Sequence, residues 1–193
     1  MGYITLKKGD DGIIDFIFDQ PGKSVNTMGT DYEEAMQASI LELQAMVAKG
    51  DVVGVYVKSG KAGQFFAGGD IKDMLAMDLD VDVAEKTRMY EALMRTKRPL
   101  RILETLGVPV VVGINGPALG GGYEIALSCH RRIALHDVVV GLPEAAIGLM
   151  PGAGGIVRLS RLLGMQDAMP LIAQGRRLKA AKALEKGLLD ELV

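Results

Sequence analysis

The sequence is poor in the residues and patterns that mark several large classes of protein. Its 193 residues include one cysteine, two histidines and no tryptophan, and aromatic side chains make up only 5% of the chain. The single cysteine, Cys129, cannot form a disulfide within the chain, which indicates a reducing compartment. No stretch approaches the roughly 18 uninterrupted apolar residues of a membrane span, and the first residues lack the apolar segment of a signal peptide. We therefore expect a cytoplasmic protein with no membrane span.

An excess of either charge is also missing. Lys and Arg total 22 against 24 for Asp and Glu, so the formal net charge is −2. This balance provides no basic surface for a nucleic acid, and we expect no nucleic-acid partner. Hydrophobic residues make up 49% of the chain, which is enough for a folded core and excludes a disordered chain.

Glycine, in contrast, is abundant, with 25 residues. At the usual share of about 7%, a chain of this length would hold roughly half as many. The hydrophobic pattern predicts strands at residues 3–8, 13–18, 52–57, 108–114, 133–135 and 138–140. It predicts helices at residues 31–48, 82–97, 123–129, 143–147, 155–163, 167–173 and 180–186, a helix start at Asp70, and a break at Pro99 before a short helix that reaches residue 106. The alternation of strands and helices indicates an α/β fold with a mostly parallel sheet.

Two glycine-rich segments each follow a strand and lead into a helix. The first is FFAGGDIK at residues 65–72, and the second is NGPALGGGYE at residues 115–124. Small residues at such junctions leave backbone N–H groups free at the positive end of a helix, where they bind an anion or a developing oxyanion. Glycines at these positions also occur simply for a tight turn or close packing, and either segment alone leaves both interpretations open.

Two glutamates stand in apolar surroundings. Glu124 follows the glycine triplet in the first turn of an apolar helix, and Glu144 lies in GLPEAAI at residues 141–147. Carboxylates in apolar settings are costly unless they are paired or functional, and two of them can divide acid and base duties. We expect the helix start to favour the ionised form of Glu124. The alternative is that both carboxylates only stabilise the starts of their helices.

Other catalytic patterns fail when their spacing is counted. Position 17 is Ile17 where a P-loop ending at residues 22–24 needs glycine, and position 157 is Val157 where a dinucleotide fingerprint needs glycine. His130 and His136 are six residues apart, a spacing that does not place both imidazoles on one face of a helix, and no carboxylate cluster accompanies them. We therefore expect no metal site. The chain also has no G-x-S-x-G elbow, so a serine hydrolase is not supported.

Taken together, the segments resemble the crotonase (enoyl-CoA hydratase/isomerase) superfamily over nearly the whole chain, and within it the hydratase part of the multifunctional β-oxidation enzymes. The stretches that carry the resemblance are SVN at residues 24–26, AGGDIK at 67–72, NGPALGGGYE at 115–124, GLPE at 141–144, GLMPGAGG at 148–155 and ALEKGLLD at 183–190. The resemblance implies a spiral of repeated ββα units and coenzyme A thioesters as substrates.

The resemblance also implies roles for particular residues. The peptide N–H groups of Gly69 and Gly121 would form an oxyanion hole for the thioester oxygen, and Glu124 and Glu144 would be the catalytic residues of a hydratase. The residues expected to line the path of the thioester and its pantetheine arm are Ala67, Gly68, Asp70, Ile71 and Lys72, the last near the CoA phosphates. No cofactor is expected, because coenzyme A is part of the substrate.

A longer protein is implied as well. Family hydratases continue with several helices beyond the point where this chain stops at Val193, so we expect residues 1–193 to be the core domain of a longer chain, lacking the usual C-terminal helices. In the intact enzyme the resemblance suggests a 3-hydroxyacyl-CoA dehydrogenase region and a thiolase subunit as partner, or otherwise a trimer-based homo-oligomer. Two other functions stay open, namely Δ3-Δ2-enoyl-CoA isomerisation by Glu144 alone and a non-catalytic domain that binds CoA thioesters or serves assembly.

Overall fold

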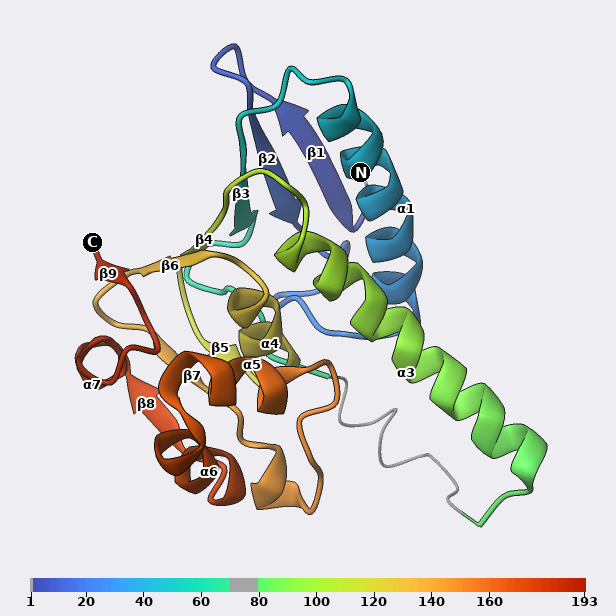
Figure 1. Cartoon of the computed structure of the whole chain (residues 1–193), viewed down its shortest axis with the longest axis vertical. Helices are drawn as coiled ribbons and strands as arrows, with labels where there is room; N and C mark the ends of the chain where they lie inside the picture. Colours follow the sequence, from blue (N-terminus) through green and yellow to red (C-terminus); the bar gives the residue numbers. More distant parts are fainter. Residues whose placement is uncertain (1, 70–79) are drawn as a thin grey trace.

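Two β-sheets carry the fold, and helices pack around them (Figure 1). The computed structural model describes residues 2–69 and 80–193. The larger sheet has the strand order β1-β2-β3-β4-β6-β9. Its strands are β1 (Ile4–Lys8), β2 (Ile13–Phe18), β3 (Gly54–Ser59), β4 (Val110–Ile114), β6 (Arg131–Ala134) and β9 (Glu191–Leu192). Only β1 and β2 pair antiparallel, while every other neighbouring pair in this sheet is parallel.

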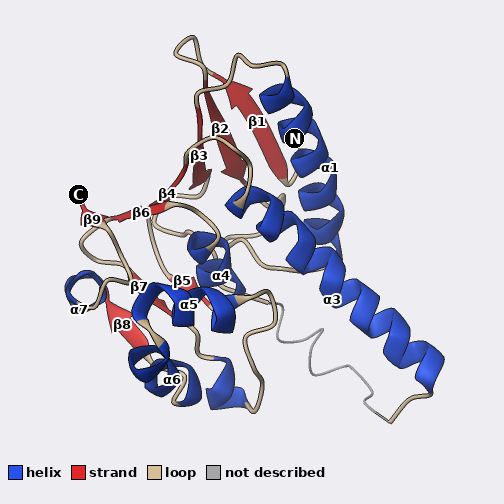
Figure 2. Cartoon of the chain, viewed as in Figure 1, coloured by secondary structure: helices blue, strands red, loops and turns tan. Residues whose placement is uncertain are grey.

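The smaller sheet and most of the later helices form a second layer (Figure 2). Its strands are β5 (Ala118–Leu119), β7 (Val139–Gly141) and β8 (Arg177–Lys179), in the order β5-β7-β8. The described helices are α1 (Thr30–Ala48), α3 (Val83–Glu104), α4 (Gly121–Leu127), the 3-10 helix η1 (Glu144–Ile147), α5 (Gly155–Leu163), α6 (Met165–Ala173) and α7 (Ala180–Glu185). None of these described helices is long and apolar enough to cross a membrane.

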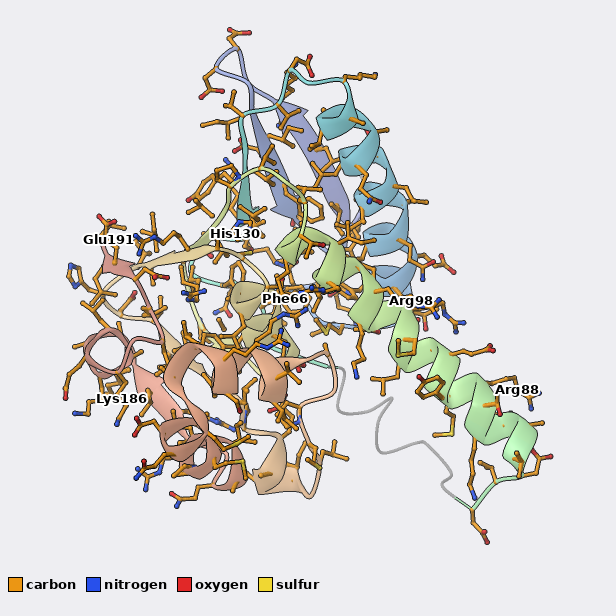
Figure 3. All side chains as sticks on the ribbon, in the orientation of Figure 1. Phe66, Arg88, Arg98, His130, Lys186 and Glu191 are labelled. Atoms are coloured by element: carbon orange, nitrogen blue, oxygen red, sulfur yellow. The ribbon has the colours of Figure 1, made fainter. Side chains whose placement is uncertain are left out.

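Six aromatic residues gather at one place in the core, namely Tyr3, Phe16, Phe18, Tyr32, Phe65 and Phe66. On β2 the side chains alternate, so that Phe16 and Phe18 face inward with no exposed surface. Phe18 stacks on Tyr32 of α1, with ring centroids 6.2 Å apart, and meets Phe66 edge to face at 5.4 Å. Figure 3 shows Phe66 inside the molecule, whereas Arg88 of α3 points away from it. Phe66 is therefore packed against β2 and α1 at the beginning of the first glycine-rich segment.

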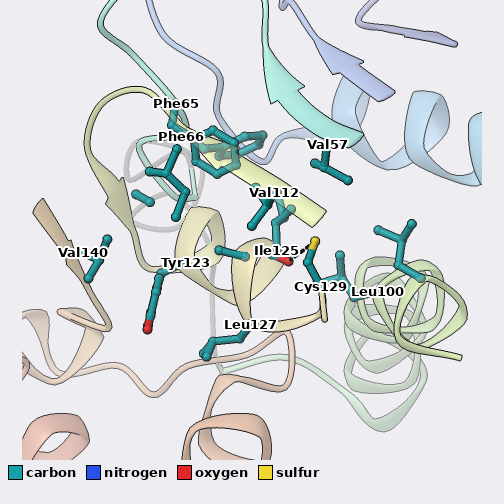
Figure 4. Packing of buried hydrophobic residues seen from close by; sticks show 14 of the residues in the cluster. Val57, Phe65, Phe66, Leu100, Val112, Tyr123, Ile125, Leu127, Cys129 and Val140 are labelled. Atoms are coloured by element: carbon teal, nitrogen blue, oxygen red, sulfur yellow. Dashed lines mark hydrogen bonds between the residues drawn. The ribbon is translucent and has the colours of Figure 1, made fainter. Parts of the chain in front are cut away.

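Helix α4 is the central element of the molecule. Each of its residues is buried, and Figure 4 shows Tyr123, Ile125 and Leu127 surrounded by residues of the sheets and of α3. The hydroxyl of Tyr123 donates a hydrogen bond of 2.9 Å to the carbonyl of Leu188. A helix held on all sides gives any functional group on it a defined position.

Most of the predicted elements are confirmed, together with the α/β class. The hairpin of β1 and β2 and the helices α1 and α5 begin and end within one residue or two of the predicted bounds. The predicted break at Pro99 is wrong, because α3 runs from Val83 to Glu104 with Pro99 inside it. Proline removes one helical hydrogen bond, but the turn that follows it buries Leu100 and Leu103 in the core, which stabilises the helical path. The helix start predicted at Asp70 lies outside the described residues.

Candidate active site

The two glycine-rich turns lie against each other. The N–H of Phe66 donates to the carbonyl of Pro117 at 3.1 Å, and the N–H of Leu119 donates back to the carbonyl of Phe66 at 3.2 Å. Gly68 has φ of +98°, and a Cβ atom there would lie 2.9 Å from the carbonyl oxygen of Leu119 and 3.7 Å from the nitrogen of Gly121. Only glycine allows this approach, since the backbone of the other turn fills the space of a side chain. The two glycine-rich turns are therefore in direct contact at Gly68 and Leu119.

Gly69 and Gly121 each keep a peptide N–H without an acceptor in the described part of the chain. Gly121 is the first residue of α4, and Gly69 pairs with Met28 in an isolated parallel bridge. Buried or half-buried N–H groups are usually bonded, so free ones at a helix start are suited to an external acceptor. The positive end of the α4 dipole favours an acceptor that gains negative charge.

Glu124 projects from the first turn of α4 and is 2% exposed. Its Oε1 accepts a hydrogen bond of 2.7 Å from the N–H of Gly155, at the start of α5. Burial raises the pKa of the Glu124 carboxyl above its ordinary value, although the amides of Gly155 and Ala153 and the charges of Arg158 and Lys97 oppose that rise. The shift therefore runs against the ionised form that the helix start was expected to favour, because desolvation is the largest contribution to it.

Glu144 is the first residue of η1 and approaches the second glycine-rich turn. Its Oε1 would lie 3.0 Å from a Cβ atom on Gly120, and its Oε2 is buried with no hydrogen-bond partner among the described residues. Burial raises the pKa of the Glu144 carboxyl to about 7, a hydrogen bond from its own N–H opposes this, and the charge of Glu124 adds to it. A carboxyl that titrates near neutrality suits proton transfer in either direction.

The predicted site residues therefore divide into three groups. The structure brings Gly68, Gly121, Glu124 and Glu144 together, with Gly69 on the turn beside them. Ala67 is exposed on that turn and donates its N–H to the carbonyl of Asn26 at 3.0 Å. Asp70, Ile71 and Lys72 lie outside the described residues.

Two residues that help to build the site, Gly155 and Asn26, were not assigned a role from the sequence. Gly155 ends the GLMPGAGG motif at residues 148–155, and its N–H donates the hydrogen bond that holds the Glu124 carboxylate. Asn26 ends the SVN motif at residues 24–26, and its buried side chain accepts from the N–H of Gln20 at 2.9 Å and donates to the carbonyl of Phe65 at 2.9 Å. An isolated asparagine and a glycine run carry no signal for these contacts, because both depend on long-range pairing.

His130 is exposed, and its Nδ1 accepts a hydrogen bond of 2.8 Å from the N–H of Val110. No three His, Cys, Asp or Glu side chains among the described residues gather as a group that could hold a metal ion. The groups that the described residues bring to this site are carboxylates and peptide N–H groups.

The fold agrees with the family that the sequence resembles. A family model described as Enoyl-CoA hydratase/isomerase matches residues 9–193. The chain therefore belongs to the enoyl-CoA hydratase/isomerase (crotonase) family. Among solved structures, the chain is similar to an enoyl-CoA hydratase from Bacillus anthracis, with 30% identity and a TM-score of 0.85 over 99% of this chain and 70% of that one. It is also similar to Pseudomonas aeruginosa DspI, with 30% identity and a TM-score of 0.84 over 100% of this chain and 74% of that one.

The curated relatives are longer proteins. The chain is 37% identical over 98% of its length to the fatty acid oxidation complex subunit alpha of Idiomarina loihiensis. It is 34% identical, again over 98% of its length, to the protein of the same name from Shewanella halifaxensis. In both comparisons the chain spans 26% of the relative's length, about a quarter.

Proposed function

We propose that this chain catalyses the addition of water to a trans-2-enoyl-CoA, giving a 3-hydroxyacyl-CoA, in fatty acid β-oxidation. The observation that carries the proposal is the pair of carboxylates beside the two glycine-rich turns, the buried Glu124 and the half-buried Glu144, whose pKa values are both raised. Hydration needs a proton donor, an acceptor for the proton of water, and a group that stabilises negative charge on the thioester oxygen. The residues of this one site are suited to all three tasks.

In the proposed reaction the carboxylates divide the proton transfers. Glu144 in its protonated form gives a proton to the α-carbon, while the water oxygen bonds to the β-carbon. The proton that the water loses passes to the ionised Glu124, which orients the water, alone or jointly with Glu144. The total number of protons on the pair is unchanged, and the product is the 3-hydroxyacyl thioester. Coupled carboxylates of raised pKa support this division, because one of the two is readily protonated near neutral pH.

The peptide N–H groups of Gly69 and Gly121 act as the oxyanion hole in this proposal. As the double bond is consumed, charge builds on the thioester oxygen, and two fixed donors stabilise that charge more than they stabilise the ground state. We assign the thioester and pantetheine path to the 67–72 segment, with Lys72 near the CoA phosphates. No cofactor takes part, because coenzyme A belongs to the substrate.

The proposal extends to the whole protein through its relatives. Curated relatives are named as alpha subunits of a fatty acid oxidation complex, and this chain corresponds to about a quarter of their length. We propose that the protein acts in such a complex, with a thiolase subunit as partner. A dehydrogenase activity, if the intact protein has one, resides outside these residues.

The direct test is an assay of the purified chain with crotonyl-CoA. The proposal expects loss of the absorbance of the conjugated thioester and formation of 3-hydroxybutyryl-CoA. A folded chain that binds the thioester but leaves it unchanged would instead support the non-catalytic assembly domain, and it would overturn the hydratase assignment.

Isomerisation of a Δ3-enoyl-CoA to the Δ2 isomer is the second candidate. The observation in its favour is that Glu144 alone has a buried carboxyl oxygen without a partner among the described residues, and moving one proton between carbons needs only one acid/base group. Incubation with a 3-enoyl-CoA distinguishes the two reactions, because the isomerase generates the conjugated absorbance that the hydratase removes. Replacement of Glu124 by glutamine abolishes hydration and spares isomerisation if both reactions occur.

A further inference from the structure

Arg158 lies at the centre of a polar cluster behind Glu124. It is the fourth residue of α5 and is 9% exposed, which is unusual for an arginine. Its Nη1 donates a hydrogen bond of 2.9 Å to the carbonyl of Ala153. Its Nε and Nη2 face Oε2 of Glu104, on the last turn of α3, each at 3.3 Å. Arg158 thus connects α3 to the turn that precedes α5.

This turn delivers the amide that holds Glu124. Ala153 and Gly154 come directly before Gly155, whose N–H donates to Oε1 of Glu124 at 2.7 Å. Gly154 has φ of +105°, and a Cβ atom on it would clash with Nη1 of Arg158. Glycine at this position therefore lets the guanidinium lie directly on the turn. The two hydrogen bonds, one from Arg158 and one to Glu124, fix successive peptide units of the same turn.

Glu104, the partner of Arg158 on α3, is itself held in place by a second arginine, Arg101. Glu104 is partly buried, which opposes its ionisation, but its hydrogen bond with Arg101 and the charge of Arg158 keep the pKa of Glu104 below its ordinary value. The Arg101 contact spans 2.9 Å and comes from the same helix. A carboxylate that stays ionised gives the guanidinium of Arg158 a permanent partner on α3.

We propose that Arg158 is a positioning residue for Glu124: it ties the 153–155 turn to α3 and so fixes the peptide N–H that orients the carboxylate. This inference rests on the proposed function only for its consequence in catalysis, since the contacts themselves do not depend on the reaction. Arg158 does not contact the reacting atoms in this assignment. Its effect passes through the turn and through its positive charge.

The groups that act on Glu124 come from four other elements. The charge of Arg158 on α5 and the charge of Lys97 on α3 lower the pKa of Glu124. The charge of Glu124 in turn raises the pKa of Glu144 on η1 and that of Tyr32 on α1. Removal of Arg158 leaves Lys97 as the cation among these groups, so the pKa of Glu124 rises.

The test compares Arg158→Met, Arg158→Lys and the control Arg161→Met, which removes an exposed arginine of the same helix. The first readout is the pKa of Glu124. It is measured by a pH titration with NMR of labelled glutamate carboxyl carbons, in which the Glu124 signal is assigned from its absence in Glu124→Gln. We expect a higher pKa in Arg158→Met, a value nearer that of the wild type in Arg158→Lys, and no change in Arg161→Met. An unchanged pKa in folded Arg158→Met overturns the proposal.

The second readout is the steady-state kinetics of hydration. We expect kcat to fall about 10- to 100-fold in Arg158→Met with little change in KM, because a displacement of about 1 Å in a catalytic group can cost about 100-fold in rate. Arg158→Lys keeps the charge but lacks the planar fork, so its kcat stays below that of the wild type. If Arg158→Met does not fold, Arg158→Lys is used to test the proposal instead. A wild-type kcat in Arg158→Lys overturns the proposal. An inactive wild-type chain contradicts the proposed function alone, because the NMR titration still tests the arginine.

Discussion

The carboxylate of Glu144 lies directly against Gly120, where the second glycine-rich turn enters α4. A Cβ atom on Gly120 would lie 3.0 Å from Oε1 of Glu144. The N–H of Gly120 also donates to the carbonyl of Gly141 at 2.9 Å, just before η1 in the chain. Gly120 therefore connects the turn that carries the N–H of Gly121 with the segment that carries the Glu144 carboxylate.

This contact predicts that Gly120→Ala lowers kcat about tenfold or more, because the added methyl group displaces the carboxylate from its place beside the turn. Gly120 has φ of +53°, so the variant also loses stability from backbone strain. The matched control is Gly50→Ala, since Gly50 has φ of +82° but an added Cβ meets nothing within 4 Å. Kinetics and urea unfolding are measured on both variants. An equal loss of kcat in both would attribute the effect to strain rather than to Glu144.

Glu144→Gln is predicted to lower kcat for hydration by roughly 10²–10⁴, the usual contribution of a general acid or base. Glutamine keeps the shape of the side chain but cannot carry the transferred proton. The comparison is Glu42→Gln, an exposed carboxylate on α1 whose loss should leave the kinetics unchanged. Wild-type hydration by folded Glu144→Gln would remove this residue from the mechanism.

The pH dependence of kcat/KM should follow the carboxylate pair. Burial raises the pKa of Glu144 to about 7 and also raises that of Glu124, so the proton on Glu144 is lost as the pH rises through about 7. If the singly protonated pair is the active form, kcat/KM falls above about pH 7, and it falls again at acidic pH when both carboxyls are protonated.

The same profile must appear in the dehydration direction, because the overall reaction takes up and releases no proton. Measurement of kcat/KM with crotonyl-CoA and with 3-hydroxybutyryl-CoA across the pH range provides this check. A flat profile between pH 5 and pH 9, given the pKa of about 7 for Glu144, would contradict the shared-proton mechanism.

Asn26→Leu is predicted to destabilise the fold by about 2 to 5 kcal/mol, since it leaves buried groups without partners. The side chain of Asn26 has no exposed surface, accepts from the N–H of Gln20, and donates to the carbonyl of Phe65 and the hydroxyl of Ser59. Urea unfolding measures the change, with Gln44→Leu on the exposed face of α1 as the comparison. A loss no larger than that of the comparison variant would mean that these hydrogen bonds contribute little.

The sequence predicted the elements with strong local signals. The hairpin of Ile4–Lys8 and Ile13–Phe18 and the helix at Gly155–Leu163 follow from turn residues and from hydrophobic periodicity, which act over a few neighbouring residues. It did not predict the two-residue strands β5 and β9, because strands that short exist only through pairing with distant partners. The break expected at Pro99 shows the same limit, since burial of the following turn outweighs a local preference.

By itself the sequence determined which groups are available: two glycine-rich turns, two glutamates in apolar surroundings and the family motifs that connect them. Only the tertiary structure decided how these groups meet, with Glu144 against Gly120 and Glu124 held by Gly155. It also decided the direction in which the pKa of Glu124 shifts, because the helix start predicted a lower pKa and burial raises it. The physical reason is that a dipole at a helix end is a local property, whereas desolvation depends on everything that packs around the carboxylate.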